Sequence, residues 1–278
     1  MDDRPIGVFD SGLGGLTVLK EIRDILPQEN IIYFGDCGRT PYGVKSPETV
    51  RRYSFQNTRF FMEAGVKLLV IACNTSSACA FEPIEAALDF PVVEVIRPGS
   101  TEAAGMTRNK KVGVIGTSAT VASGVYEDVF RKIDPSVEII TQACPLFVPL
   151  AEEGPRWWDH DSARIIAEEY LGGLRDTGID SLLLGCTHYP LLSNVIQAAV
   201  GDGIKLISSA RAVAAEVRGR LDALEMRRGN TGAKEADISF YTSDSPEKFE
   251  PLCVAILGEP AATRVHRLDI EKYESRLP

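Results

Sequence analysis

The chain lacks the features that define several large classes of protein. Its 278 residues contain no apolar run near the roughly 20 residues of a membrane span, and the acidic start is neither a signal peptide nor a transit sequence. No stripe of basic residues occurs and the net charge is −9, so we expect neither nucleic acid nor membrane as a partner. These absences predict a cytoplasmic protein. At roughly 100–200 residues per domain, its length predicts about two domains.

Motifs for common metal and cofactor sites are also missing. No Cys-x-x-Cys pair occurs among the six cysteines, which argues against zinc ribbons and thioredoxin-like sites, so we expect no metal. The segment Gly12-Leu13-Gly14-Gly15 is not G-x-G-x-x-G, because Thr17 stands at the last glycine position. A P-loop lysine motif is absent as well, so a nucleotide site has little support.

Short apolar runs alternate with longer amphipathic ones. We predict strands over Ile6–Phe9, Ile31–Phe34, Lys67–Ala72, Val92–Ile96, Lys111–Ile115, Val137–Thr141, Ser181–Gly185, Lys205–Ile207 and Asp237–Tyr241. We predict helices over Leu16–Leu26, Pro47–Glu63, Ser76–Leu88, Ser118–Ile133, Asp161–Thr177, Leu191–Val200, Ala210–Leu224 and Glu247–Leu257. The strands are continuous apolar runs, which is typical of parallel strands covered on both faces, so the fold class is α/β.

Two features repeat along the chain at similar offsets. IGVFDSG at 6–12 returns as VGVIGTS at 112–118, an offset of 106 (112 − 6), while Cys73 and Cys186 differ by 113 (186 − 73). We therefore predict two similar α/β domains with mainly parallel sheets flanked by helices, pseudo-symmetric about an interdomain cleft. The first domain would comprise 1–97 plus a returning C-terminal tail, 208–278, and the second 98–207.

Each half carries a cysteine at the end of an apolar strand, in LLVIACNT (68–75) and in SLLLGCTH (181–188). A single such cysteine is usually a small buried hydrophobe. Two at equivalent positions favour thiol chemistry on opposite sides of one atom, such as moving a proton from one face of a carbon to the other. We expect a helix N-terminus close to both thiols, which lowers a thiol pKa. Ligands bind beyond the carboxyl ends of parallel strands, so Asp10, Cys73 and Cys186 should surround one cleft.

Four other places offer candidate side chains, each with a plainer interpretation. His188 stands two residues after Cys186 and either assists that thiol or only caps a loop. Asp10 is either a helix N-cap or a functional carboxylate. Tyr42 and Gly43 lie in a turn-rich loop that is a surface turn or a substrate cover. Glu152 belongs to a solvated face or reaches the site of the second thiol.

Together these residues resemble the glutamate racemases of the aspartate/glutamate racemase superfamily. The matching stretches, in the order of the family, are VFDSGLGGLTV (8–18), YFGDCGRTPYG (33–43), IACNTSSA (71–78), IGTSATVASGVY (115–126), CPLFVPLAEEG (144–154) and LGCTHYPLL (184–192). The resemblance extends from residue 6 to about 192 and is loose in the C-terminal tail. None of the six stretches contains a lysine, although composition alone does not exclude pyridoxal phosphate.

The resemblance implies an activity and a role for each motif residue. It implies interconversion of L- and D-glutamate without a cofactor, supplying D-glutamate for peptidoglycan synthesis and cell shape, by a homodimer. Cys73 and Cys186 match the two acid/base cysteines, the first acting on the D- and the second on the L-enantiomer. The polar groups that assist the thiols match Asp10, Glu152 and His188. The substrate contacts match Asp10, Ser11, Tyr42, Gly43, Asn74, Thr75, Thr187 and His188.

Two departures and three alternatives remain. Ser208 stands where the family commonly has Asp, and Cys37 is unusual in its loop. An aspartate or other amino-acid racemase on the same scaffold would differ in substrate preference. A cysteine hydrolase would use Cys186 with His188, although such neighbours rarely meet as nucleophile and base and Cys73 would be unexplained. A non-catalytic amino-acid-binding protein would bind glutamate without exchanging its α-proton.

Overall fold

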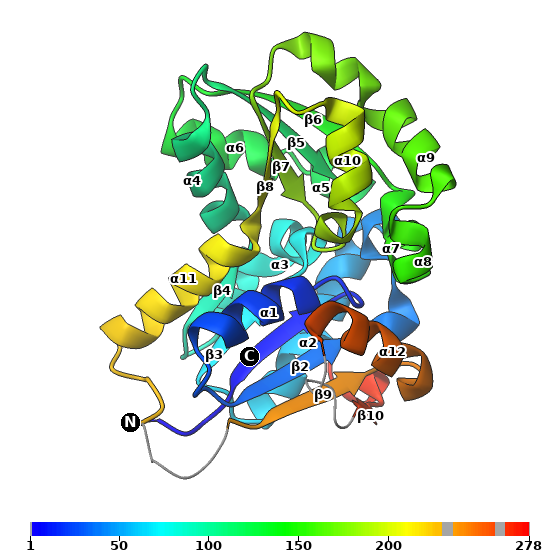
Figure 1. Ribbon diagram of the computed structural model, residues 1–278. Coiled ribbons are helices and arrows are strands. Elements are labelled where there is room, and N and C mark those ends of the chain that lie inside the picture. Colours follow the sequence, from blue (N-terminus) through cyan, green and yellow to red (C-terminus); the bar gives the residue numbers. More distant parts are fainter. Residues whose placement is uncertain (1, 230–235, 259–264, 278) are drawn as a thin grey trace.

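The computed structural model describes residues 2–229, 236–258 and 265–277, in which all strand pairing is parallel. The strands of these residues are β1 (Ile6–Asp10), β2 (Ile31–Gly35), β3 (Leu68–Ile71), β4 (Val92–Glu94), β5 (Lys111–Gly116), β6 (Glu138–Ala143), β7 (Ser181–Gly185), β8 (Lys205–Ser208), β9 (Ile238–Thr242) and β10 (Val265–Arg267). They form a six-stranded sheet in the order β10-β9-β2-β1-β3-β4 and a four-stranded sheet in the order β6-β5-β7-β8 (Figure 1).

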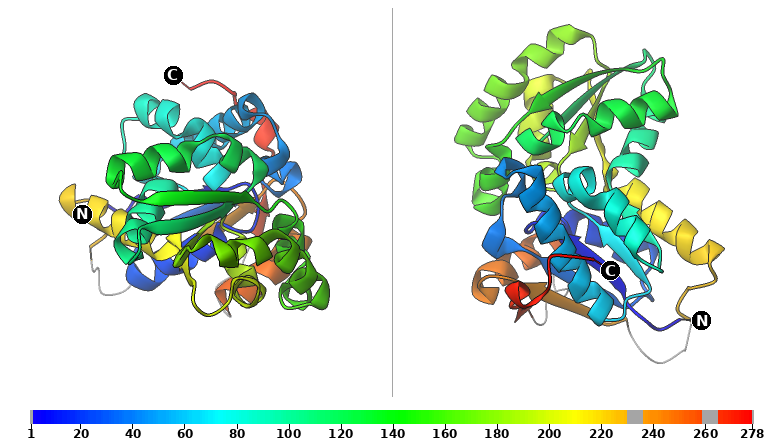
Figure 2. Two further views of the ribbon diagram at one scale, coloured as in Figure 1. Left: turned by 90° about the horizontal axis from the view of Figure 1, so that it is seen from above. Right: turned by 180° about the vertical axis from the view of Figure 1, so that it is seen from behind.

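Helices cover the faces of both sheets, as expected for an α/β fold (Figure 2). The α-helices are α1 (Leu16–Ile25), α2 (Pro47–Glu63), α3 (Asn74–Ala87), α4 (Ile96–Met106), α5 (Ser118–Ala122), α6 (Val125–Ile133), α7 (Phe147–Glu152), α8 (Pro155–Trp158), α9 (Asp161–Leu171), α10 (Ser193–Val200), α11 (Ser209–Ala223) and α12 (Pro246–Leu257). Short 3-10 helices cover Cys37–Arg39, Tyr42–Val44, Gly172–Thr177, Tyr189–Leu192 and Ile270–Lys272.

The repeat in the sequence corresponds to a repeat in strand order. In the first sheet the second strand of the chain lies beside the first, followed by the third and fourth, as β2-β1-β3-β4; the second sheet has the same order as β6-β5-β7-β8. The matched motifs form β1 and β5, the first strand of each half. Cys73 and Cys186 follow β3 and β7, the third strand of each half, so the two cysteines occupy equivalent places.

The structure corrects several predicted elements. The expected strand Val92–Ile96 ends at Glu94, because the Glu94 carboxylate accepts the backbone N–H groups of Ile96 and Arg97 at 2.5 and 2.8 Å and begins α4 there. The expected helix Ser118–Ile133 is two helices, interrupted at Gly124, whose φ is 68°. The helix expected over Asp161–Thr177 becomes 3-10 after Leu171. Sequence patterns missed α4, α7, α8 and β10 altogether.

The C-terminal part of the chain returns to the first sheet. From the end of β8, α11 leads away from the four-stranded sheet and packs on α1 and α4 (Figure 1). β9 then pairs with β2, and β10 pairs with β9. The prediction of a domain made of 1–97 and 208–278, beside a second domain of 98–207, remains our proposal for where the chain divides.

A buried ion pair holds the returning segment at the amino-terminal ends of β2 and β3. The Lys67 ammonium donates to the Glu29 carboxylate at 2.6 Å and to the carbonyl oxygens of Asp2 and Met226 at 2.8 Å each, with the Lys67 side chain fully buried. Glu29 also accepts the backbone N–H of Arg228 at 2.9 Å. Removing one member of such a pair typically costs about 3–5 kcal/mol, so this contact holds the segment after α11 in place.

Candidate active site

The carboxyl ends of the central strands of both sheets surround one small cavity. Its walls come from the residues that follow β1, β3, β5 and β7 and from the loop after β2, where ligands bind in open parallel sheets. The residues that line it are Ser11, Pro41, Tyr42, Gly43, Cys73, Asn74, Thr75, Thr117, Val148, Cys186, Thr187 and His188. The free space is about 10 Å³, roughly what one water needs, so the walls must separate to admit a larger molecule.

Cys73 is the N-cap of α3, so its sulfur lies at the positive end of a helix. The backbone N–H of Ser76 donates to Sγ at 3.4 Å, and the thiol donates to Ser11 Oγ at 3.5 Å. Burial nevertheless raises the pKa of Cys73 to about 11, helped by the nearby Asp10 carboxylate and opposed by its hydrogen bonds with Ser11 and Ser76. At neutral pH this thiol therefore holds its proton.

Cys186 has a different partner, the side chain of His188. A turn, closed by the N–H of Tyr189 on the Cys186 carbonyl at 3.1 Å, brings His188 Nδ1 to 3.8 Å from Cys186 Sγ. The other ring nitrogen, Nε2, lies 3.0 Å from Glu152 Oε1. Burial alone would lower the pKa of His188, but its hydrogen bonds and charge interactions with Cys186 and Glu152 raise it well above the ordinary value. A protonated His188 stabilises negative charge on Cys186.

One expectation about the surroundings of Cys186 is wrong. The expected helix at Leu191 begins as α10 only at Ser193, so the 3-10 turn Tyr189–Leu192, and not the start of an α-helix, follows the second thiol. The contact of His188 with Cys186, which the sequence left open, is present because the turn brings the imidazole to the sulfur. Glu152 does reach the site of the second thiol, but through His188.

Asp10 lies behind the cavity and joins the two sheets. Its side chain is fully buried at the end of β1, where Oδ2 accepts the N–H of Gly12 at 2.9 Å and Oδ1 accepts the hydroxyl of Thr187 at 3.1 Å. Burial raises the pKa of Asp10, while His188 and these hydrogen bonds oppose that rise. Asp10 is therefore connected to the tips of both β1 and β7 without lining the cavity.

The glycine-rich turn after β1 makes room for the tip of β7. A Cβ on Gly14 would lie 2.4 Å from Thr187 Oγ1 and 2.5 Å from His188 Nδ1, so only glycine fits there. The hydroxyl of Thr17 adds a bond to the Thr187 carbonyl at 3.1 Å. The backbone of this turn thus approaches the tip of β7 closely.

The loop after β2 contributes Pro41, Tyr42 and Gly43 to the cavity wall. The hydroxyl of Tyr42 points elsewhere and donates to the buried Asp36 carboxylate. Asp36 also accepts from Arg39 Nε at 2.7 Å and from Ser243 Oγ at 2.7 Å, and Ser243 follows β9. The C-terminal part of the chain therefore holds this loop in position, and Tyr42 meets the cavity by its ring or backbone.

Three threonine hydroxyls connect the two halves beside the thiols. Thr75 Oγ1, at the start of α3, lies 3.0 Å from Thr117 Oγ1 and 3.2 Å from Thr120 Oγ1, and the last two lie 3.0 Å apart. Thr117 lines the cavity but was not predicted as a site residue. The repeat contains a signal for it, because the offset of 106 maps Ser11 onto Thr117 (11 + 106). Pro41 and Val148 were also missed, and Val148 carries no comparable signal.

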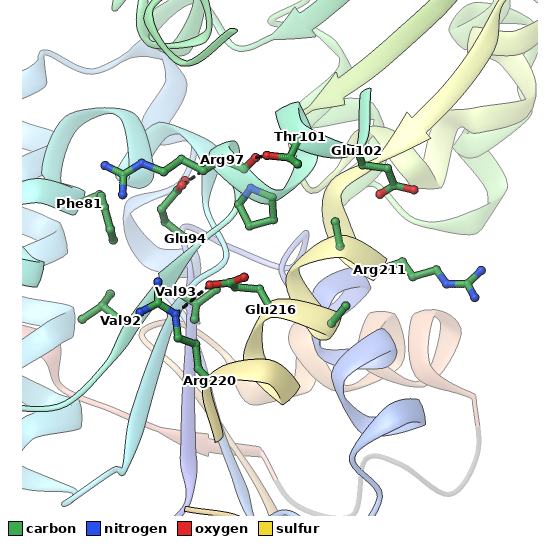
Figure 3. Close-up of a pocket in the computed structure, with 13 residues that line it drawn as sticks. Phe81, Val92, Val93, Glu94, Arg97, Thr101, Glu102, Arg211, Glu216 and Arg220 are labelled. Atoms are coloured by element: carbon green, nitrogen blue, oxygen red, sulfur yellow. Dashed lines mark hydrogen bonds and ion pairs between the residues drawn. The ribbon is translucent and has the colours of Figure 1, made fainter. Parts of the chain in front are cut away.

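A much larger pocket lies elsewhere. It measures about 610 Å³, is formed by β4, α4, α11 and Phe81 of α3, and shares no residue with the cavity of the thiols (Figure 3). Its charges are partly satisfied internally, since Arg220 Nε lies 2.8 Å from Glu216 and the Arg97 guanidinium stacks 4.5 Å over the ring of Phe81. Its lining includes no cysteine, whereas the smaller cavity has two, so we place the chemistry there.

The described residues contain neither a metal-binding cluster nor a membrane-spanning helix. Within residues 2–229, 236–258 and 265–277, His, Cys, Asp and Glu side chains form no cluster suited to a metal ion. In the same residues, no helix has both the length and the apolar character to cross a membrane.

The fold and the cavity together define a class of enzyme. Two pseudo-symmetric parallel sheets present one thiol each to a single small space, the arrangement needed for proton transfer at opposite faces of one carbon. The family model for Asp/Glu/Hydantoin racemases matches residues 6–217. The chain belongs to this racemase family and is an isomerase.

Named relatives narrow the comparison. The chain is 51% identical over 246 residues to a glutamate racemase of Geobacter metallireducens, covering 88% of this chain and 90% of the relative. Its structure resembles that of glutamate racemase from Francisella tularensis in complex with D-glutamate, with a TM-score of 0.90, 35% identity and coverage of 98% and 100%. Glutamate racemase from Thermus thermophilus in complex with beta-chloro-D-alanine gives a TM-score of 0.85 at 41% identity, with coverage of 98% and 100%.

Proposed function

We propose that this chain interconverts L- and D-glutamate. The observation that carries the proposal is that Cys73 and Cys186, at equivalent places in the two halves, line the same cavity. Relatives and solved structures named as glutamate racemases, one of them in complex with D-glutamate, support glutamate as the substrate. The more distant aspartate racemase structures, at 18–19% identity, share only the fold.

In each direction of the reaction, one thiol acts as the base and the other as the acid. In the L-to-D direction the Cys186 thiolate takes the α-proton, and the Cys73 thiol gives its proton to the opposite face of the carbon. The negative charge then resides on Cys73, and the D-to-L reaction reverses each step. The protonated His188 at 3.8 Å and the raised pKa of Cys73 support this starting distribution of charge.

Other groups bind the substrate and stabilise the carbanion. The N-terminus of α3 presents backbone N–H groups at Asn74 and Thr75, which suit a carboxylate. The polar side chains of Ser11 and Thr187 also line the cavity. Closing the two halves around glutamate excludes water and strengthens these interactions. Asp10 holds Thr187 in place, and Glu152 holds the His188 imidazole beside the Cys186 thiol.

Four further statements belong to the proposal. Catalysis needs no cofactor, and the cavity lining includes no lysine that could form an aldimine with pyridoxal phosphate. The enzyme acts in the cytoplasm, supplies D-glutamate for peptidoglycan, and forms a homodimer. Sedimentation velocity of the purified chain tests the last statement directly.

A cysteine hydrolase is less well supported. Cys186 and His188 do lie in contact, as a hydrolase requires. Such an enzyme would, however, have no use for Cys73, which faces the same cavity from the other sheet.

The direct test is racemisation followed by circular dichroism. Extensively dialysed enzyme, free of pyridoxal absorbance, should convert both D- and L-glutamate to the racemate, with D-aspartate as the matched poor substrate. Absence of turnover, or turnover only after pyridoxal phosphate is added, would contradict the proposal.

A further inference from the structure

The Asn74 side chain beside Cys73 is only half satisfied. Its Nδ2 donates to the Tyr126 hydroxyl at 2.9 Å, while its Oδ1 is buried and accepts no hydrogen bond from any residue that the structure describes. A buried amide oxygen without a hydrogen bond destabilises the protein, so a donor that reaches it is favourable. Asn74 lines the cavity, where a bound molecule can supply that donor.

Tyr126 is placed so that it touches both strand tips that carry a cysteine. It stands in the first turn of α6, directly after the break at Gly124, and only 2% of it is exposed. A Cβ on Gly185 would lie 2.9 Å from the Tyr126 hydroxyl, so this oxygen packs against the residue before Cys186. The same oxygen holds Asn74, the residue after Cys73. The hydroxyl therefore lies between the two tips.

We propose that Tyr126 is a positioning residue that sets the orientation of the Asn74 amide. By accepting from Nδ2, its hydroxyl leaves Oδ1 to accept a hydrogen bond from the α-ammonium group of glutamate. The inference rests on the proposed function. An amide oxygen can only accept, so it suits an ammonium and repels a carboxylate.

The opposite orientation of the Asn74 amide would bind a different group of the substrate. If the amide were rotated, Tyr126 would donate to Oδ1, and Nδ2 would face the cavity and donate to a substrate carboxylate. The two orientations can be separated with glutarate, which keeps both carboxylates of glutamate but lacks the α-ammonium group.

The variant Tyr126→Phe removes one hydroxyl and keeps the ring. Losing the orienting bond should raise KM for D- and L-glutamate about 3- to 10-fold with kcat within about twofold, because the contact is made equally in ground and transition states. The inhibition constant of glutarate should not change. The control is Tyr170→Phe, where the lost hydroxyl only accepts the Leu146 N–H at 3.4 Å. Its KM should equal that of the wild type.

A double-mutant cycle shows whether Tyr126 acts through Asn74. Adding Tyr126→Phe to Asn74→Ala should leave KM as it is in Asn74→Ala alone, because the amide to be oriented is gone. If Asn74→Ala turns over too slowly, calorimetric titration with D-glutamate replaces KM.

Three results would overturn the inference: an unchanged KM in Tyr126→Phe, a parallel loss of glutarate inhibition, or additive effects in the cycle. Racemisation by the wild type tests the proposed function separately, so the two failures are distinguishable.

Discussion

The tips of β3 and β7 occupy equivalent places in the two halves, yet they surround their cysteines differently. Cys73 caps an α-helix and donates a hydrogen bond to Ser11, and its burial raises its pKa to about 11. Cys186 is followed by a turn and contacts His188, which Glu152 holds from behind. A repeated fold thus places two thiols in equivalent positions but gives each thiol different hydrogen-bond partners, the asymmetry on which the proposed acid and base roles rest.

The tip of each strand is also hydrogen-bonded to the other half of the protein. Thr187 beside Cys186 bonds to Asp10, and Thr75 beside Cys73 contacts Thr117 of the other half. Both contacts cross between the sheets next to the cavity. Opening the cavity for glutamate must therefore stretch or break some of these polar contacts, and closing it re-forms them around the substrate.

Removing either thiol should have the largest effect. We expect Cys73→Ala and Cys186→Ala each to lower racemisation roughly 10³-fold or more, since general acid–base catalysis contributes about 10²–10⁴-fold. Any residual α-proton exchange in D₂O, followed by NMR, should be confined to L-glutamate in Cys73→Ala and to D-glutamate in Cys186→Ala. Wild-type racemisation by either variant would show that the tips are not an acid/base pair. The control is Cys253→Ala, which removes a buried thiol of the hydrophobic core.

Removing the charge behind His188 should have an intermediate effect. Glu152→Gln should lower kcat/KM roughly tenfold, because a neutral hydrogen bond replaces a charge-assisted one and each loss of about 1.4 kcal/mol is a factor of ten. The two enantiomers have equal free energy, so kcat/KM must fall equally in both directions, and asymmetry can appear only in kcat and KM separately. Progress curves from both enantiomers measure this.

The matched control for that variant is Glu153→Gln, which changes the exposed neighbouring carboxylate. An equal loss of activity in Glu153→Gln would show that general surface charge, and not the contact with His188, is responsible.

The smallest effect is expected on stability as a function of pH. The folded-state pKa of His188 is raised above the unfolded value of about 6.5, so its contribution is complete below that pH and is lost as pH rises through the folded pKa. The Tm difference between wild type and His188→Asn should therefore be largest near pH 6, at about 2–4 °C, and shrink towards alkaline pH.

His266→Asn, at an exposed histidine, provides the control and should give no such pH-dependent difference. A Tm difference for His188→Asn that is constant with pH would mean that its imidazole is not held in the charged form.

Much of the site could be predicted because it follows strands. Apolar runs predict β1, β3 and β7, and parallel strands gather their carboxyl ends, so Asp10, Cys73 and Cys186 were expected around one cleft. The two cysteines line the cavity, whereas Asp10 lies behind it. The repeat predicted two similar α/β halves, and the shared strand order of the two sheets confirms this. Only the local helix assignment failed at Cys186, where Pro190 signals a helix start but a 3-10 turn comes first.

Contacts between distant segments could not be predicted. The bond of Glu152 to His188 crosses 36 residues and depends on α7, which has no clear periodicity in the sequence. Tyr126 stood inside a recognised motif, but its bond to Asn74 exists only because α6 packs against the other half. The C-terminal tail has an even weaker sequence pattern for its last strand, since β10 has only three residues and lies at the edge of a sheet.

The central claim is that two thiols, one on each face, form a single acid/base pair. The most direct measurement is deuterium incorporation during the early conversion of protiated D-glutamate to L-glutamate by the wild type in D₂O. The account predicts an L-product that carries deuterium at the α-carbon while the remaining D-substrate keeps its proton. An L-product that retains the original proton, or equal early deuteration of substrate and product, would indicate one base and contradict it.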